Sequence, residues 1–414
     1  MESVPSTVSD YSEAKPEEES GSSLFGGYTI LAKSMMGSGL LGVAAACAKD
    51  GWILGGVISA VIPLLTFLSL HLLAVLAIDF VARHGKPITF YKLCDSILGR
   101  SGGWLVEIAL ILKTFGASIV YLQVAGSMLA TLVWSPEMDL SISAVTRLFQ
   151  IGLAALFAPF CYLERISNTK YINTLGIACL VYILVIACVY FDASAAATTS
   201  LYPQSFLSVL SKIPIFVFAY ACHQNVFACV QEVRRPTLQR MDLIMALACV
   251  TGFLIYLPVM AFPYATYGSA VADNFLKNLP AQDVGTKIAF VCAAVSVSVS
   301  FPLQIIPLRN TVCGLIFLDD KPTHKRQKVV RYVVASIAIL GALGIALAVS
   351  SLGIVMAITG LVGGNTVCFL APSLLYVKRF PRDHRMWYLA AALVVFSVSL
   401  YPLCLVGIAL APSR

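Results

Sequence analysis

Long apolar segments separated by short polar ones fill almost the whole chain after residue 24. Each segment is about 20 residues or longer, which is the length that an α-helix needs to cross a bilayer. Only Ser350, Ser351 and Gly353 suggest a turn between the ninth and the tenth. The pattern predicts eleven membrane-spanning helices at 25–48, 52–81, 104–134, 142–162, 171–191, 206–231, 241–267, 284–317, 330–350, 351–377 and 387–411.

The composition excludes an ordinary soluble protein. Of the 414 residues, 59% are hydrophobic and only 12% are charged, whereas soluble domains carry about 25% charged residues. The net charge of +7 comes from basic residues in short loops, so it implies no nucleic-acid partner. We therefore expect an all-α polytopic membrane protein. Residues 1–23, acidic and polar, are expected to form a disordered cytosolic tail, and residues 24–414 the transmembrane domain.

The basic residues are divided unevenly between the loops. Alternate loops, beginning after the second apolar segment, hold eighteen lysines and arginines, and the other loops with their flanks hold six. Basic loops remain in the cytosol, so the N-terminus is expected there and the C-terminus outside or in a lumen. In the basic loop 82–103, the sequence PITFYKLCDSILG has the spacing of an amphipathic helix lying on the cytosolic face.

The first apolar segment contains a short stretch that disfavours a continuous helix. Lys33 is followed by Gly37, Ser38 and Gly39 where a stable helix would prefer alanine or leucine. An unwound turn inside a membrane persists only where it lines a cavity, and the N–H groups that it frees attract an anion such as a carboxylate. The alternative interpretation is that the small residues form a notch for a neighbouring helix.

A second interruption is predicted in the sixth segment. His223, Gln224 and Asn225 break its apolar run near the middle of the membrane. Interruptions in the first helix of each half, segments one to five and six to ten, are typical of inverted-repeat transporters whose site lies between the breaks. Interhelical hydrogen bonding without a ligand is the alternative for these three side chains.

Four motifs follow one another along the chain. They are AKSMMGSGLLG followed by AKDGW, FAYACH with Glu232 closing its helix, SFPLQIIPLR from Ser300, and GGNTVCFLAPSLLYVK from Gly363. In this order they resemble the amino acid/auxin permease family between about residues 24 and 411. The resemblance implies eleven helices, the first ten folded as two inverted five-helix repeats with helices one and six broken, in agreement with the count and orientation above.

The resemblance implies where a substrate would bind. The amino-acid carboxylate would lie on the backbone of the first break, at Gly37, Ser38, Gly39 and Leu40, and the ammonium would face carbonyls of both breaks. Those carbonyls lie around Lys33 and Ser34 on one side and around Phe218, Ala219 and Tyr220 on the other. Side-chain selectivity would come from Tyr121, Tyr220, Cys222 and Ser300.

One residue departs from the pattern of sodium-coupled members. They carry an asparagine four residues before the first glycine, and this chain has Lys33 there. A fixed ammonium would repel a cation at that place, and proton-coupled members often carry lysine, so we expect proton coupling without sodium. The candidate coupling residues are Lys33, Glu107 and His223.

Charged side chains inside the apolar segments should face the bundle and have partners, because a charge at the centre of a membrane helix costs about 2.5–3.5 kcal/mol. They are Lys33, Glu107, Lys113 and Arg309. Glu107 is the acidic member, so we expect it to pair with Lys33 or Lys113. His71 is interpreted as a buried histidine with a hydrogen-bond partner.

Other function classes find little support in the sequence. The acidic residues are dispersed and form no catalytic set, and the twelve cysteines have no metal-binding spacing. We expect no enzyme, no cofactor and no metal, and an amino-acid carrier that works as a monomer, in the plasma membrane rather than an organelle. A carrier of auxin-like organic acids or polyamines, or a facilitative amino-acid uniporter or exchanger, remains the alternative.

Overall fold

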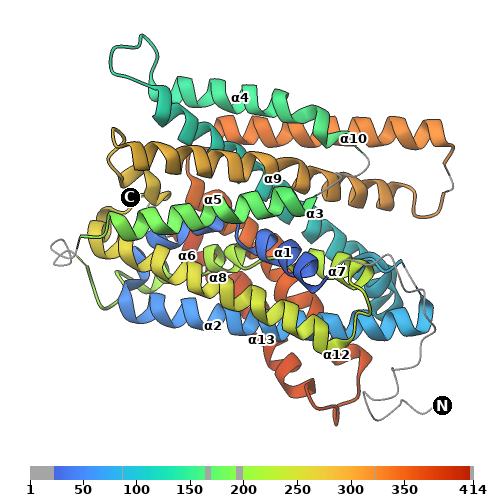
Figure 1. Cartoon of the computed structure of the whole chain (residues 1–414). Helices are drawn as coiled ribbons and strands as arrows, with labels where there is room; N and C mark the ends of the chain where they lie inside the picture. The colour runs from blue at the N-terminus through green and yellow to red at the C-terminus, as the bar shows by residue number, and fades with distance from the viewer. Residues whose placement is uncertain (1–22, 86, 164–168, 193–198, 321, 411–414) are drawn as a thin grey trace.

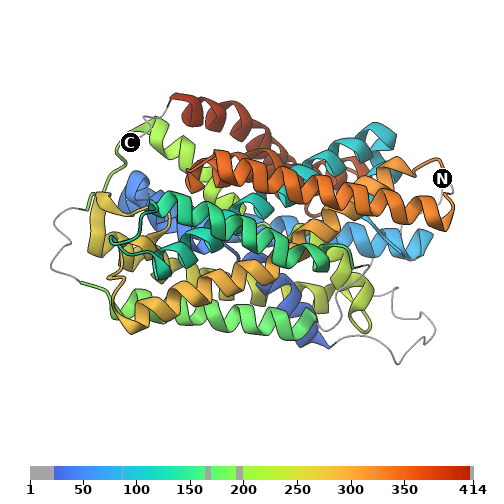
Figure 2. The same cartoon turned by 90° about the horizontal axis from the view of Figure 1, so that it is seen from above.

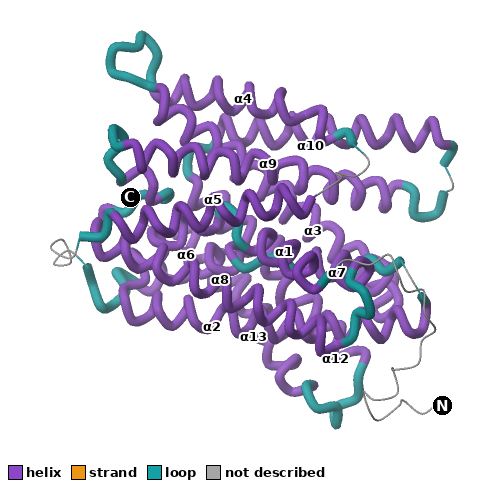
Figure 3. The backbone as a smooth tube through the Cα atoms, in the orientation of Figure 1, coloured by secondary structure: helices purple, strands orange, loops and turns teal. Residues whose placement is uncertain are grey.

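The computed structural model describes residues 23–85, 87–163, 169–192, 199–320 and 322–410. Helices and connecting loops make up this part of the chain, which contains no strand (Figure 3). The tail expected at residues 1–23 lies, apart from Ser23, outside the described residues. The helices in chain order are α1 (Leu24–Met35), α2 (Gly39–His84), α3 (Phe90–Val133), α4 (Ile142–Cys161), α5 (Thr169–Val189), α6 (Phe206–Ala219), η3 (His223–Asn225), α7 (Val226–Glu232), α8 (Leu238–Tyr267), η4 (Gly268–Ala270), η5 (Phe275–Asn278), α9 (Val284–Ile316), α10 (His324–Ala348), α11 (Leu352–Ile358), η6 (Thr359–Gly364), η7 (Thr366–Leu370), α12 (Ala371–Arg379) and α13 (Trp387–Leu410).

The described helices confirm a multi-pass membrane protein. Nine of them, some formed by consecutive elements, are long and apolar enough to cross a bilayer, and α5 supplies a shorter apolar helix at Asn173–Val189. The count of eleven and the inverted repeat stay predictions.

Two glycines bend the longest helices. Gly51 inside α2 and Gly99 inside α3 have φ values of 74° and 75°, a left-handed conformation that glycine adopts without steric cost. Each helix is thereby divided, α2 into 39–50 and 52–84 and α3 into 90–98 and 100–133. The part at 90–98 coincides with the amphipathic helix expected in the loop 82–103.

Both expected interruptions are present. Residues 36–38 between α1 and α2 are not helical, nor are residues 220–222 between α6 and the short 3₁₀ turn η3. The first break occurs where glycine and serine replace good helix formers. The second has no glycine, and it begins three residues before the polar cluster that predicted it.

The helices form one bundle with a buried centre. The helices α4 and α10 run side by side along one edge (Figure 1), and α13 lies along another edge in the view from above (Figure 2). Of the apolar stretch of α4, 22% is buried, against 78% for the stretch 206–232 that contains the second break. The helix with the second break therefore lies inside the bundle and the unbroken α4 at its surface.

A π-helical segment holds the inner helices close together. At Gly360 of η6, a Cβ atom would lie 1.9 Å from the carbonyl oxygen of Pro214 in α6. At Gly363, it would lie 2.6 Å from the backbone of Lys113 in α3. Backbone thus packs on backbone, which only glycine permits. This contact fixes the position of Lys113 next to the second break.

Candidate substrate site at the helix breaks

A small cavity lies between the two breaks. Its volume is about 20 Å³, and about 10–15 Å³ is enough for one water molecule. An amino acid needs far more space, so it would fit here only after the lining residues move apart. Its lining comes from both broken helices together with α3 and α9, and consists of Ser34, Met35, Gly37, Ser38, Gly39, Lys113, Ala117, Tyr121, Phe218, Ala221 and Gln304.

The first break presents free donors to this cavity. The N–H groups of Leu40 and Leu41 bond to the carbonyls of Gly37 and Ser38. Within the described residues, the N–H groups of Ser38 and Gly39 have no backbone acceptor, and the buried Ser38 hydroxyl has no partner. These donors begin the helix 39–50, whose dipole favours negative charge at this end. The arrangement suits a carboxylate.

The two glycines of the first break have different surroundings. A Cβ atom at Gly37 would lie 3.2 Å from the hydroxyl oxygen of Tyr121, a cavity-lining side chain. A Cβ atom at Gly39 would lie 2.6 Å from Cα of Ala219, which leaves no room for it. Gly37 therefore borders the cavity, whereas Gly39 is also the notch that lets α2 approach α6.

Tyr256 of α8 connects the two breaks. Its hydroxyl lies 2.7 Å from the carbonyl oxygen of Met35 at the end of α1 and 3.0 Å from that of Ala219 at the end of α6. One hydroxyl proton is thus shared between carbonyls that the breaks release from helical hydrogen bonds. The ring of Tyr220 packs edge-on against Tyr256 at a centroid distance of 5.0 Å.

Lys113 brings a positive charge to the cavity wall. Its side chain is 3% exposed, and Nζ donates a 3.0 Å hydrogen bond to the carbonyl of Ala221 in the second break. Since Lys113 and Ala221 both line the cavity, a substrate would meet this ammonium group.

Lys33 is equally buried but points elsewhere. Its Nζ donates to the Ser296 hydroxyl of α9 at 2.9 Å and lies 3.5 Å from the Ser296 carbonyl oxygen. A Cβ atom at Gly176 of α5 would lie 2.3 Å from Cε of Lys33, so the lysine passes over this glycine. The Ser300 hydroxyl donates to the same Ser296 carbonyl at 2.7 Å. The ammonium group of Lys33 is therefore held between α1, α5 and α9.

The prediction that Glu107 forms an ion pair with Lys33 or Lys113 is wrong. The ion pairs formed by the described residues include neither Glu107 nor Lys33 nor Lys113. The carboxylate of Glu107 faces Thr311 and the backbone of Tyr91 instead. Both lysines find oxygen partners on a serine or a released carbonyl, so no carboxylate is needed.

Arg309 is buried and finds partners, whereas His71 has a partner but is only partly buried. Arg309 donates to the carbonyls of Cys161 and Leu163 at the end of α4, at 2.9 and 3.1 Å. His71 lies 2.8 Å from a carboxylate oxygen of Asp242, as expected of a histidine with a partner.

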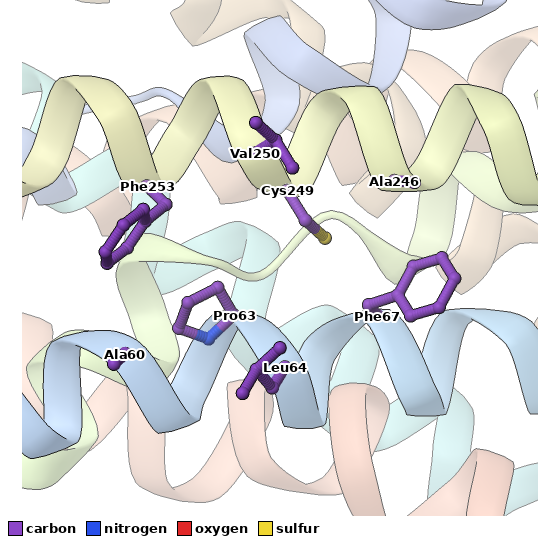
Figure 4. Close-up of a pocket in the computed structure, with 8 residues that line it drawn as sticks. All are labelled: Ala60, Pro63, Leu64, Phe67, Ala246, Cys249, Val250 and Phe253. Carbon is purple, nitrogen blue, oxygen red and sulfur yellow. The ribbon is translucent and has the colours of Figure 1, made fainter.

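A larger hollow lies outside the breaks. It has a volume of about 370 Å³ and is lined by residues of α2 and α8, which run side by side (Figure 4). Its walls are apolar, and two of its lining residues, Leu64 and Val250, are 68% and 55% exposed. Nothing in this lining can hold an ammonium or a carboxylate group, so the small polar cavity is the better candidate despite its size.

Comparison with known proteins decides the family. Residues 20–410 match the family described as transmembrane amino acid transporter protein. The chain belongs to this family. The transporter is 27% identical to vacuolar amino acid transporter 5 of Schizosaccharomyces pombe, over 84% of this chain and 82% of the relative.

Two further relatives are also named as amino acid transporters. Vacuolar amino acid transporter 6 of Saccharomyces cerevisiae is 25% identical over 68% of this chain and 74% of its own. Sodium-coupled neutral amino acid transporter 7 of Rattus norvegicus is 25% identical over 89% of this chain and 81% of its own. The matches confirm the family expected from the four motifs, and the protein is a transporter and not an enzyme.

In this transporter the residues suggested by the sequence are only partly gathered at the cavity. Ser34, Gly37, Ser38, Gly39, Tyr121 and Phe218 line it, whereas Leu40, Ala219, Tyr220, Cys222 and Ser300 do not. Ser300 lies with Lys33, and Tyr220 packs behind the cavity on Tyr256. Nε2 of His223 is 2.6 Å from the Ser69 hydroxyl of α2, an interhelical hydrogen bond. Their roles in transport stay predictions.

Sequence reasoning missed several cavity residues. Gln304 follows Ser300 by one helical turn inside the quoted motif SFPLQIIPLR, which is the signal that could have found it. Its side chain faces the hydroxyl of Tyr121. The sequence indicates Lys113 only as a charged residue inside an apolar segment. Met35, Ala117 and Ala221 have no polar side chain to draw attention to them.

Proposed function

We propose that this protein is a secondary active transporter of amino acids that works by alternating access. The observation that carries the proposal is the meeting of two broken helices at one cavity, with free N–H groups on one side and released carbonyls on the other. A zwitterion has the complementary charges. Its carboxylate would bind Ser38 and Gly39, and its ammonium group the carbonyls of Met35 and Ala219 after Tyr256 has moved.

The proposal includes the topology expected from the sequence. Dividing α2 at Gly51, joining 39–50 to α1, and counting α5 as a span gives eleven membrane helices. The first ten would form two inverted five-helix repeats, with breaks in the first helix of each. Both breaks are buried, at Met36 and Ser38 in the first and at Ala221 and Cys222 in the second, which supports this arrangement.

Coupling to protons rather than sodium is also part of the proposal. The ammonium group of Lys33 lies between α1, α5 and α9 on two oxygen atoms of Ser296. It supplies the positive charge that a bound cation would bring, and Coulomb repulsion would oppose a second cation there. The relative from Rattus norvegicus is named sodium-coupled, so sodium dependence must be tested directly.

The alternative substrates fit the cavity less well. A polyamine would place its ammonium groups near Lys113 at the cavity wall, where like charges repel. An auxin-like acid would use the N–H groups but leave the released carbonyls without a cation. A facilitative uniporter or exchanger for amino acids would use the same site, and it differs only in its energy source.

We propose an organelle membrane as the working location in place of the plasma membrane. Two relatives are named vacuolar, whereas the plasma membrane is expected from no residue of the sequence. The C-terminus would then be luminal. A fluorescent fusion at the cytosolic N-terminus, imaged against vacuolar and plasma-membrane markers, tests the location.

Uptake into liposomes tests the function. The purified protein is reconstituted and labelled amino acids are supplied under an imposed proton gradient, a sodium gradient or neither. We expect accumulation of at least one amino acid under the proton gradient without sodium. Equilibration without accumulation would favour the facilitative alternative, and strict sodium dependence would overturn the coupling. Uptake of polyamines or aromatic acids alone would overturn the substrate class.

A further inference from the structure

Asp50 is a buried carboxyl group far from the substrate cavity. It ends the helix 39–50, directly before the bend at Gly51, and it is 0% exposed. Among the described residues, neither of its carboxylate oxygens has a hydrogen-bond partner. Burying an unpaired charge is very costly, so a carboxyl group in such a place is held in its neutral form.

The backbone on both sides of Asp50 is clasped by the segment 199–204, which precedes α6. The N–H groups of Trp52 and Ile53 donate to carbonyls of Ser200 and Leu201, at 3.0 and 3.1 Å. In the opposite direction, the N–H of Gln204 donates to the Lys49 carbonyl at 3.0 Å. We call 199–204 the clasp.

The clasp is also fastened to α8. The hydroxyl of Tyr264 donates to the carbonyl of Ser200 at 3.1 Å and accepts from its N–H at 2.9 Å. The ring of Tyr264 packs on Trp52 at a centroid distance of 4.7 Å. At Gly51 a Cβ atom would lie 2.5 Å from the carbonyl oxygen of Tyr202, so the clasp fits closely against the bend. Asp50 is thus enclosed where α2, α8 and the start of α6 meet.

The titratable and charged groups around Asp50 come from each of these elements. Cys47 and Lys49 belong to α2, Tyr264 to α8 and Lys212 to α6. Lys212 acts on Asp50 from a distance and forms no ion pair with it among the described residues. By sequence, residues 193–198 add no charged side chain. Among the described residues, neither Lys49 nor Lys212 forms an ion pair with Asp50, so no cation contacts its carboxyl group while the clasp is closed.

We propose that Asp50 is a proton-binding site that controls an outer gate formed by the clasp. The gate closes after Asp50 takes a proton from the outer or luminal solution, and ionised Asp50 holds it open by requiring water or Lys212 as a partner. On reopening, the proton returns to the same side. Asp50 thus makes the conformational cycle depend on outer pH and transfers no net charge itself.

The gate connects with the substrate site through one rigid element. Residues 39–50 form a continuous helix with Gly39 at the cavity and Asp50 at the clasp, a length of about 17 Å at 1.5 Å per residue. Movement of the clasp is therefore transmitted to the N–H groups that would bind a carboxylate. The inference rests on the proposed function and on its topology.

Hydrogen exchange measured by mass spectrometry tests the gate without transport. In the purified protein, the amides of Trp52, Ile53 and Gln204 should exchange about tenfold faster at pH 8 than at pH 5.5, after correction for intrinsic rates, because the ionised acid opens the clasp. In Asp50→Asn they should stay protected at both values. The exposed outer residue Asp139 provides the matched control, and Asp139→Asn should behave like the wild type.

Transport measured with the same variants separates this inference from the proposed function. With inner pH fixed, the wild-type rate should vary with outer pH, and Asp50→Asn should flatten that profile while accumulation persists. Unchanged pH dependence of exchange in Asp50→Asn, or its absence in the wild type, would overturn the gate. Wild-type protein that shows pH-dependent exchange but takes up no amino acid would overturn the proposed function and leave the gate intact.

Discussion

Each helix break has a buried lysine beside it, and the two lysines are used differently. Lys33, 5% exposed, comes just before the first break and donates to Ser296 of α9, outside the cavity. Lys113, 3% exposed, comes from α3 and donates to the carbonyl of Ala221 in the second break, at the cavity wall. Neither forms an ion pair among the described residues.

The difference lies in what each ammonium group can reach. Lys33 joins three helices, as a bound cation between them would, and does not line the cavity. Lys113 lines the cavity, where a substrate bound as we propose would meet it. Removing Lys33 should therefore affect the transport cycle for every substrate, whereas removing Lys113 should affect the choice of substrate.

The largest expected effect comes from Lys33→Met. Losing a charged hydrogen-bond donor in the interior costs about 1.5–3 kcal/mol, which corresponds to about 10- to 100-fold in an equilibrium. We expect uptake to fall by that factor for all amino acids at unchanged protein abundance, measured in liposomes containing equal amounts of protein.

Lys33→Arg sharpens this prediction. The Lys33 side chain packs so closely on Gly176 that a Cβ atom there would lie 2.3 Å from Cε of the lysine. The larger guanidinium group of arginine therefore has little space. It keeps the charge but does not release a proton. Partial activity would mean that the charge alone suffices, and loss equal to that of methionine would fit either crowding or proton release. Wild-type uptake that requires sodium and ignores a pH gradient would contradict both a role for the charge of Lys33 in place of a cation and a role in proton release.

The two glycines of the first break provide the next test. Gly39→Ala places Cβ 2.6 Å from the backbone of Ala219, and overpacking of this kind costs about 1–3 kcal/mol. We expect a lower melting temperature together with loss of uptake. In Gly37→Ala the neighbour is the Tyr121 hydroxyl at 3.2 Å, so uptake should fall with little change in melting temperature. Equal melting temperatures for the two variants would contradict the distinction.

This distinction shows where sequence reasoning reaches its limit. The apolar segments and the alternation of basic loops predict a multi-pass helical protein, and low helix propensity predicts the break at Gly37, Ser38 and Gly39. Whether a glycine borders a cavity or a helix depends on which element packs against it. That information lies in α3 and α6, far away in sequence.

The error about Glu107 has the same origin. A buried lysine needs an oxygen partner, and the sequence suggests a carboxylate because only side chains are visible in it. The structure supplies the carbonyl of Ala221 and the hydroxyl of Ser296 instead. Released carbonyls exist only because the helices are broken, and their direction cannot be derived from residue types.

Tyr256→Phe tests whether the breaks act together. The variant removes the hydroxyl that lies 2.7 and 3.0 Å from the carbonyls of Met35 and Ala219. Leaving a buried acceptor without a partner costs about 1–3 kcal/mol. If the empty site depends on this bridge, the apparent affinity for the transported amino acid, measured by uptake, should change by about tenfold. Thermal unfolding should show that the protein stays folded. Tyr162→Phe, which removes a hydroxyl 2.8 Å from the Ser336 hydroxyl of α10 and away from both breaks and the clasp, is the control for a lost hydroxyl, and it should leave substrate affinity nearly unchanged.

The smallest expected effect, and the one that separates the two lysines most clearly, concerns Lys113→Met. An ammonium group at the cavity wall disfavours substrates with a cationic side chain. Two charges about 8 Å apart repel by about 2 kcal/mol at an effective dielectric constant of 20. The variant also loses the hydrogen bond to Ala221, but a water molecule in the cavity can replace that donor, so uptake of neutral amino acids should fall only several-fold. Relative uptake of lysine and arginine should rise.

Competition for a labelled neutral substrate measures this change in selectivity. The ratio of inhibition by lysine to inhibition by a neutral amino acid should increase in Lys113→Met, by about tenfold or less because water enters the open site. Any residual uptake by Lys33→Met should show the wild-type ratio, since that ammonium group does not line the cavity. If both variants change the ratio equally, the lysines do not differ in their access to the substrate. An unchanged ratio in Lys113→Met, with neutral uptake reduced, would place Lys113 among the residues that only support the second break.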